Sequence, residues 1–300
     1  MKLGILLVAY GCGNLRGASA LRAVQAAAEE RFRLPVRWAF TSEAMRLRLA
    51  SSRTKSDSVY KALMRMSYER YTHIGVQPLH LIPGMEYGAV AEDCRAMTNT
   101  GRLSVCLGLP LLSSGDHDNS VTRSSHALLR HVSPLRSSEE HVIYMAHGSR
   151  HECDILYRRL GEHVGRLDHH VHIACMISRS SAASAPSSGT ISIPDGLDIL
   201  LPEIVPSLSE TKKIWLLPLL SVVGRHTLED MAGNAPSSWK TRLSKAGFDC
   251  VAELRGLADD PLFIQLWLDR LESSLLSLGY SPQPSGLPCR LPAHLVKITS

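Results

Sequence analysis

Two apolar segments of this 300-residue chain end in nearly the same way, and a second matching segment follows each of them. Residues 6–11 (LLVAYG) correspond to residues 143–148 (IYMAHG), with Tyr10 in the place of His147. The following segments match at offsets of six and eight residues from a proline: Pro78, Gly84 and Glu86 in the first half, and Pro218, Gly224 and His226 in the second. We infer that the chain is built from two related halves.

Strand and helix patterns alternate in both halves. Short β-branched apolar runs are separated by segments with helical periodicity, which is typical of βαβ units and parallel sheets. The predicted strands cover residues 3–9, 36–40, 73–77 and 103–107, then 141–146, 171–176, 214–218 and 248–253. The predicted helices cover residues 18–31, 42–49, 56–68, 83–97 and 119–131, then 153–167, 197–206, 237–246 and 261–278.

The sequence therefore predicts an α/β fold of two pseudo-symmetric lobes, each a parallel four-stranded sheet flanked by helices. We expect an N-terminal lobe over residues 1–133, a C-terminal lobe over residues 134–280, and a proline-rich tail over residues 281–300. Loops that follow parallel strands share one edge of the sheet, where open α/β folds bind ligands. The strand-end residues of both halves are thus expected to meet in a cleft between the lobes: Tyr10, Glu86, His147 and His226.

The composition limits the classes of partner. With 44% apolar and 20% charged residues the chain can bury a large core, and its net charge is only +5. Lys and Arg are scattered and form no basic stripe interleaved with aromatic residues, which argues against a nucleic-acid partner. A small positive excess suits an anionic small molecule.

Cysteine usage and the N-terminus indicate a cytoplasmic protein. The seven cysteines contain no CxxC pair, so a zinc knuckle, a redox motif and a disulfide framework are all disfavoured. Residues 1–20 imitate a short export signal, but their apolar stretch is the strand that the internal match requires. No run reaches the roughly 18 apolar residues of a membrane span, so we expect no membrane partner. A homo-oligomer is compatible with the sequence, which does not give the oligomeric state.

His147 is the first candidate for chemistry. It ends an apolar strand, and Gly148 after it leaves room for a ligand or the backbone to approach closely. A neutral imidazole there can bind a metal ion or accept a proton near neutral pH. The alternative is a strand-end histidine satisfied by a neighbouring carbonyl. The internal repeat favours the functional interpretation, because it places His226 near His147.

His226 and Glu86 are the next candidates. His226 lies in a loop with glycines at both ends and an acidic pair, Glu229 and Asp230, which suits a metal ligand presented at a helix start but also an acidic capped turn. Asp230 is interpreted as a capping residue or as a residue that supports His226. Pro83 can open a helix whose first turn holds Glu86, so Glu86 is either functional or a surface residue that complements the helix dipole. His80, in the same loop, is a weaker candidate.

Two other features are predicted to lie on the surface. The histidines at positions 169, 170 and 172 alternate along a strand edge and have no second acidic or cysteine partner at metal spacing, so we expect them to be solvated. Residues 178–192, rich in Ser and Ala, are expected to form a flexible loop.

Taken together, five segments resemble the anaerobic-pathway cobalt chelatases that insert cobalt into sirohydrochlorin, a family related to the class II ferrochelatases. The segments are residues 6–11 (LLVAYG), 38–42 (WAFTS), 76–87 (VQPLHLIPGMEY), 145–148 (MAHG), and 230–233 (DMAG) with 238–240 (SWK). The match spans about residues 1 to 275, and the segments are specific only in combination.

The resemblance implies a two-lobed chelatase fold with the tetrapyrrole in the cleft. It implies that His147 and His226 are metal ligands and that His147 is also the base that accepts pyrrole protons. Catalytic roles are assigned to His147 and Glu86, and substrate-binding roles to Tyr10, Gly11, Ser42 and Gly148. The metal is a substrate, Co²⁺ with Fe²⁺ as a second candidate, and no organic cofactor is expected.

The chain departs from the family pattern at two positions. The family carries a third ligand, a Glu, at the end of the second strand of the second half, and the corresponding residue here is Ile177 or Ser192, depending on the alignment. We expect Glu86 to supply the missing oxygen ligand, because the internal repeat places it opposite His226. The usual Gly-Asp-His is also Gly224-Arg225-His226 here, and Arg225 is a candidate contact for substrate carboxylates.

The sequence thus predicts a cytoplasmic sirohydrochlorin cobalt chelatase that serves cobalamin or sirohaem biosynthesis. The competing hypothesis is a non-catalytic tetrapyrrole- or metal-binding protein that kept the cleft and lost turnover with the Glu. A metal-dependent hydrolase is a weaker third hypothesis, because the sequence offers neither a clear nucleophile nor a carboxylate set for two metal ions.

Overall fold

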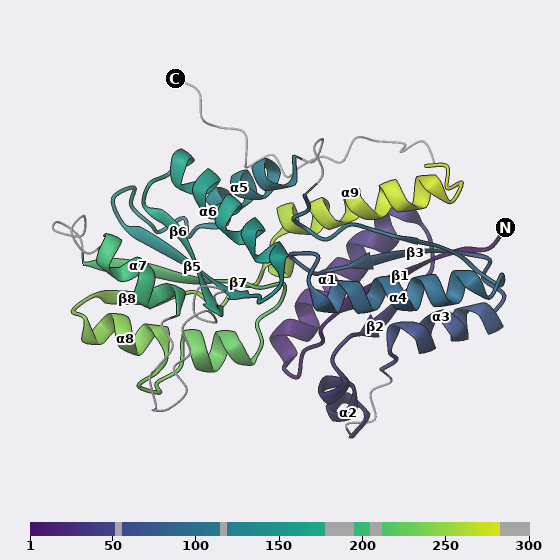
Figure 1. Ribbon diagram of the computed structural model, residues 1–300, viewed down its shortest axis with the longest axis horizontal. Helices are drawn as coiled ribbons and strands as arrows, with labels where there is room; N and C mark the ends of the chain where they lie inside the picture. Colours follow the sequence, from purple (N-terminus) through teal and green to yellow (C-terminus); the bar gives the residue numbers. More distant parts are fainter. Residues whose placement is uncertain (52–55, 115–118, 178–194, 205–211, 283–300) are drawn as a thin grey trace.

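A computed structural model describes residues 1–51, 56–114, 119–177, 195–204 and 212–282 of the chain (Figure 1). In chain order, its first half contains β1 (Leu3–Ala9), α1 (Leu15–Phe32), β2 (Val36–Phe40), α2 (Glu43–Ser51), α3 (Val59–Tyr68), β3 (His73–Pro78), α4 (Met85–Asn99), β4 (Ser104–Leu107) and α5 (Ser120–His131). These strands form one parallel sheet in the order β2-β1-β3-β4.

The second half repeats this topology. It contains β5 (His141–Gly148), η1 (Glu152–Asp154), α6 (Ile155–Leu167), β6 (Val171–Ile177), α7 (Gly196–Ile204), β7 (Lys213–Leu219), η4 (His226–Met231), α8 (Trp239–Lys245), β8 (Asp249–Ala252), η5 (Leu257–Asp259) and α9 (Pro261–Ser277). The parallel order β6-β5-β7-β8 is that of the first sheet with each strand replaced by its counterpart. The predicted fold class, two parallel four-stranded sheets with flanking helices, is therefore confirmed.

The central strands are apolar because helices cover both of their faces. In β1 and β5, alternate residues belong to different clusters: Ile5 and Tyr144 lie in a core shared by both halves, whereas Leu6 and Ile143 face separate outer cores. The shared core also holds Trp267 of α9. It joins the two sheets through buried side chains.

Two helices lie across the sequence boundary between the halves. The helix α5 packs against α6 of the second half, and α9 runs back over β3 and β4 of the first sheet (Figure 1). Leu275 of α9 is so close to β3 that a methyl group on Gly75 would be 2.6 Å from its Cδ2 atom. The division into residues 1–133, 134–280 and 281–300 stays a prediction, and residues 283–300 lie outside the described part.

The two strand-end glycines of the internal repeat also share a backbone conformation, a positive φ angle. Gly11 after β1 has φ +111° and Gly148 at the end of β5 has φ +78°, both in the region that side-chain-bearing residues rarely adopt. This explains why the repeated pattern ends in glycine in both halves. In the described residues, the structure has no helix that is both long and apolar enough to cross a lipid bilayer.

Candidate functional site

Loops that follow the strands of the first sheet contact loops that follow the strands of the second sheet. Asn14, after β1, donates from Nδ2 to the carbonyl of Val223, after β7, at 2.8 Å. Ser221, also after β7, donates its hydroxyl to the carbonyl of Leu79, after β3. A methyl group on Gly84 would be 4.0 Å from Oγ of Ser149, which follows β5. The expected meeting of strand ends from both halves is therefore present.

The structure brings His147 and His226 together. His147 is the penultimate residue of β5, and His226 begins η4, a short π-helix after the neighbouring strand β7. Their ring centroids are 5.0 Å apart and the rings meet edge to face at 69°. An ion bound to one nitrogen of each ring at about 2.1 Å tolerates centroids up to roughly 6.5 Å apart. The distance between the rings is thus compatible with one ion bound to both imidazoles.

Both rings keep the same nitrogen available. Nδ1 of His147 is 3.1 Å from the carbonyl of Gly148, and Nδ1 of His226 is 2.6 Å from the carboxylate of Asp230. A carbonyl and an ionised carboxylate only accept hydrogen bonds, so Nδ1 is the donor in both rings. Nε2 of each ring then carries a lone pair for a metal ion or a proton.

Asp230 contacts His226, which favours the second of the two interpretations of this residue, support of His226 rather than capping. It lies four residues after His226 on η4, and both side chains are 45% exposed. This is the arrangement in which a carboxylate fixes the orientation and tautomer of a metal-binding imidazole. The spacing of His226 and Asp230 could have indicated the contact, but the π-helix that produces it could not be read from the sequence.

Gly148 also fixes the strand next to His147. It pairs with Ile177 at the end of β6, and a methyl group on Gly148 would lie 1.9 Å from the carbonyl oxygen of Ile177. The strand-based alignment of the family Glu therefore leads to a residue that touches Gly148. The other aligned position, Ser192, lies outside the described residues.

Glu86 lies in the helix that follows β3, and its side chain pairs with His80. It occupies the first turn of α4, its side chain is 49% exposed, and its carboxylate is 3.4 Å from Nε2 of His80. Within the described residues, Glu86 does not join His147 and His226 in a closed group of three metal ligands. Its proposed part in metal binding requires the side chain to turn from His80.

The candidate substrate residues of the first half lie together. The backbone amide of Ser42 donates to the carbonyl of Tyr10 at 3.3 Å, and Gly11 lies against Met45 of α2. The side chain of Tyr10 is 52% exposed. Tyr10, Gly11 and Ser42 thus lie just beyond the carboxyl ends of β1 and β2, the place in the first half that corresponds to His147 and Gly148 in the second. Arg225 is highly exposed and forms an ion pair with Glu229 at 2.8 Å.

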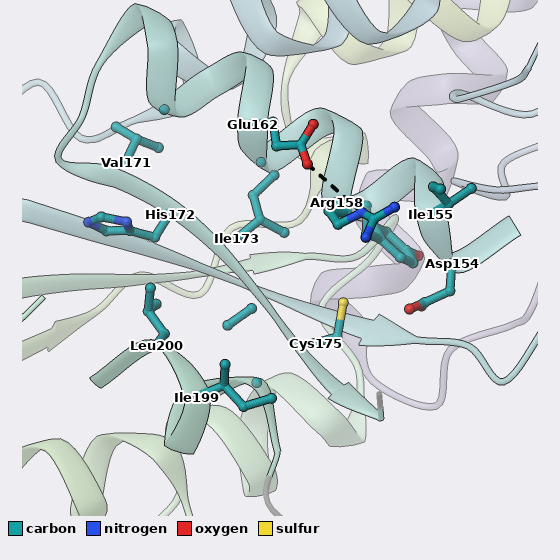
Figure 2. Close-up of a pocket in the computed structure, with 15 residues that line it drawn as sticks. Asp154, Ile155, Arg158, Glu162, Val171, His172, Ile173, Cys175, Ile199 and Leu200 are labelled. Atoms are coloured by element: carbon teal, nitrogen blue, oxygen red, sulfur yellow. Dashed lines mark ion pairs between the residues drawn. The ribbon is translucent and has the colours of Figure 1, made fainter. Parts of the chain in front are cut away.

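A cavity of about 620 Å³ lies elsewhere, between α6, β6 and α7 (Figure 2). Its lining includes Arg158 and Glu162, an ion pair at 3.8 Å, together with Ile173, Cys175, Ile199 and Leu200. Cavity size alone does not locate chemistry, and none of the candidate site residues lines this space. We therefore assign the site from the converging loops and histidines.

Comparison with protein families and relatives gives one consistent result. The model of the cobalt chelatase (CbiK) family matches residues 3–275. A sirohydrochlorin cobaltochelatase CbiKC from Nitratidesulfovibrio vulgaris is 46% identical over 280 residues, which are 92% of each chain. A sirohydrochlorin cobaltochelatase from Salmonella typhimurium is 28% identical over 221 residues, 73% of this chain and 75% of that protein.

Solved structures share the fold at low sequence identity. SirB from Bacillus subtilis with Fe³⁺ superposes with a TM-score of 0.57 at 15% identity, covering 94% of this chain and all of that chain. The sirohydrochlorin chelatase SirB from Bacillus subtilis subspecies spizizenii in complex with cobalt gives a TM-score of 0.56 at 14% identity, with 93% and 98% covered. These structures share the two-sheet architecture with this chain.

Proposed function

The chain belongs to the cobalt chelatase (CbiK) family, and on this premise we propose that it inserts Co²⁺ into sirohydrochlorin in the cleft between the two sheets. The observation that carries the proposal is the pair of imidazoles, His147 and His226, 5.0 Å apart at the meeting strand ends. A relative of 46% identity that is named for this reaction supports the substrate. We assign the reaction to the cytoplasm.

The geometry supports different roles for the two rings in metal binding and proton uptake. His226 is held by Asp230 and presents Nε2 to the incoming Co²⁺, and His147 presents Nε2 beside it. Insertion forms metal–nitrogen bonds while two pyrrole N–H protons leave the macrocycle. We assign the uptake of these protons to His147, because a neutral imidazole is a competent base near neutral pH. Its Nε2 has one lone pair, so it accepts the protons one at a time once it has released the ion, and it passes each proton to water before it takes the next. Tyr10, Gly11, Ser42 and Gly148 line the substrate's place.

Incubating the purified protein with Co²⁺ and sirohydrochlorin tests this function. We expect the absorption spectrum to change to that of the metallated product faster than in a protein-free mixture. Binding of the tetrapyrrole without accelerated insertion would establish the competing hypothesis of a non-catalytic binding protein. The same assay with Fe²⁺ measures metal preference, which imidazole nitrogens leave open because they suit several divalent ions.

Asp230→Asn is expected to raise the KM for Co²⁺ by about 10- to 100-fold, the usual loss of metal affinity when a carboxylate that supports a metal-binding imidazole is removed. The KM for Co²⁺ should rise while the KM for sirohydrochlorin stays near the wild-type value. Glu229→Gln is the matched control, since Glu229 is adjacent but pairs with Arg225. Equal KM values for Co²⁺ in the two variants would refute the role of Asp230.

Glu86→Gln tests the carboxylate that we propose in place of the missing family Glu. If Glu86 becomes an oxygen ligand, the variant should raise the KM for Co²⁺ by about tenfold, the loss of one charge-assisted interaction of roughly 1.4 kcal/mol. Glu92→Gln, on the exposed side of the same helix, is the control. An unchanged dependence on Co²⁺ would show that Glu86 is not a ligand.

A further inference from the structure

A second group of histidines lies at the opposite end of the second sheet from the cleft. His141 begins β5, six residues before His147, and at about 3.3 Å per residue the two positions are roughly 20 Å apart. The turn that enters the neighbouring strand β6 brings Asp168, His169 and His170 to this end, and His172 follows on β6. We call these five residues the histidine cluster.

The expectation that these histidines are solvated is wrong for His170 and His172. The side chain of His170 is 13% exposed, and the ring of His172 stacks on that of His141 at 5.1 Å. His141 is itself 2% exposed, and its Nδ1 is 2.9 Å from Nε2 of His172. The sequence could not show this because His141 belongs to another strand, distant along the chain.

The buried part of the cluster supports His170. The rings of His141 and His170 meet edge to face with centroids 4.7 Å apart. Nε2 of His141 is buried and has no hydrogen-bond partner in the described part of the chain.

Asp168 supplies the acidic partner that the spacing did not indicate. Its carboxylate accepts hydrogen bonds from the guanidinium of Arg136 at 2.7 and 3.3 Å and from the amide of His170 at 2.9 Å. These hydrogen bonds fix the carboxylate in place beside His170.

The ligand atoms of the turn converge. One ligand atom from each of Asp168, His169 and His170 lies within 4.8 Å of the other two. Two ligands on one ion with bonds of about 2.1 Å stand roughly 3–4 Å apart. Because the side chain of His169 is exposed, a small rotation of it can bring the three ligand atoms from within 4.8 Å of one another to the separation that a bound ion requires. The adjacent rings of His169 and His170 have centroids 3.9 Å apart.

We propose that Asp168, His169 and His170 bind a divalent transition-metal ion at a site separate from the cleft, with the buried His141, on which His172 stacks, holding the ring of His170. Two imidazoles and one carboxylate are the ligands of Co²⁺, Ni²⁺, Cu²⁺ and Zn²⁺ rather than of Mg²⁺ or Ca²⁺. The cationic Arg136 weakens the attraction for the ion, and exposed His169 leaves the site open to solvent. The protein then binds its metal substrate at a second, exchangeable position.

The experiment counts bound ions by Co²⁺ titration of the untagged full chain, using equilibrium dialysis and the visible absorption of bound cobalt. The wild type should bind two equivalents, His169→Ala/His170→Ala one, and His147→Ala/His226→Ala one. The four-residue combination should bind none. Because the two pairs of variants remove different equivalents, failure of the cleft assignment and failure of this proposal are distinguishable.

Control variants make the outcome decisive. His126→Ala, an exposed histidine on α5, should retain both equivalents. Asp168→Asn should lose the same equivalent as the histidine pair while its circular dichroism matches that of the wild type. The proposal is overturned if His147→Ala/His226→Ala binds no Co²⁺, or if His169→Ala/His170→Ala binds as much as His126→Ala.

Discussion

Replacing His147 by alanine is expected to lower the rate of Co²⁺ insertion by about 10²- to 10⁴-fold, the range that a single general base contributes. The variant loses the proton acceptor and one of two converging imidazoles at once, and His226 alone cannot do both. The measurement is the initial rate of sirohydrochlorin metallation at saturating Co²⁺, followed by absorption.

The fold should survive this substitution, which separates a catalytic effect from unfolding. The only hydrogen bond recorded for the ring of His147 in the described residues is the one to its neighbour Gly148, so the thermal midpoint should stay close to the wild-type value. His73→Ala is the control, because His73 begins β3 at the end of the first sheet away from the cleft. A rate for His147→Ala within about threefold of that control would refute the assigned role.

Much of the fold could be predicted because the central strands β1 and β5 are buried on both faces. Such strands are continuous apolar runs, and the predicted residues 3–9 coincide with β1, in which every residue is buried. The internal repeat also predicted that the two halves have the same fold, which periodicity alone does not indicate. It also located His147 and His226, since equivalent strand ends must lie at equivalent places.

The positions of α5 and α9 could not be predicted in this way. An amphipathic helix shows which face is buried but not which sheet it covers, so the pattern of residues 261–278 was compatible with either lobe. The contact that places α9 on β3 is between Leu275 and Gly75, two hundred residues apart in sequence. The prediction that the histidines of the cluster are solvated was wrong for the same reason, because His141 and His172 come from different strands.

The contribution of Asp230 depends on local backbone geometry. Four-residue spacing in an ordinary helix places two side chains on one face, and it is as compatible with a capped acidic turn as with a supported ligand. The structure has a π-helix there, with the amide of Ala232 bonded to the carbonyl of Thr227 at 3.1 Å. Such local widening is frequent at functional sites but has no clear sequence signal.

Gly148→Ala is expected to destabilise the protein by about 3 kcal/mol, from backbone strain and overpacking together. At φ +78° a non-glycine residue costs roughly 1–2 kcal/mol. The new Cβ would also sit 1.9 Å from the carbonyl oxygen of Ile177, a backbone atom that cannot move aside without breaking the pairing of β5 and β6. Such overpacking adds about 1–3 kcal/mol.

Two matched variants isolate the cause. Gly11→Ala, at φ +111°, should cost less than Gly148→Ala, because its Cβ would meet the flexible side chain of Met45 rather than backbone. Gly165→Ala on α6 has no neighbour within 4 Å and should stabilise the helix by about 0.5–1 kcal/mol. Urea unfolding of the three variants measures the order. If Gly148→Ala is no less stable than Gly165→Ala, the left-handed turn beside His147 is not needed for the fold, and the glycine in the repeat must instead be explained by the approach of the tetrapyrrole.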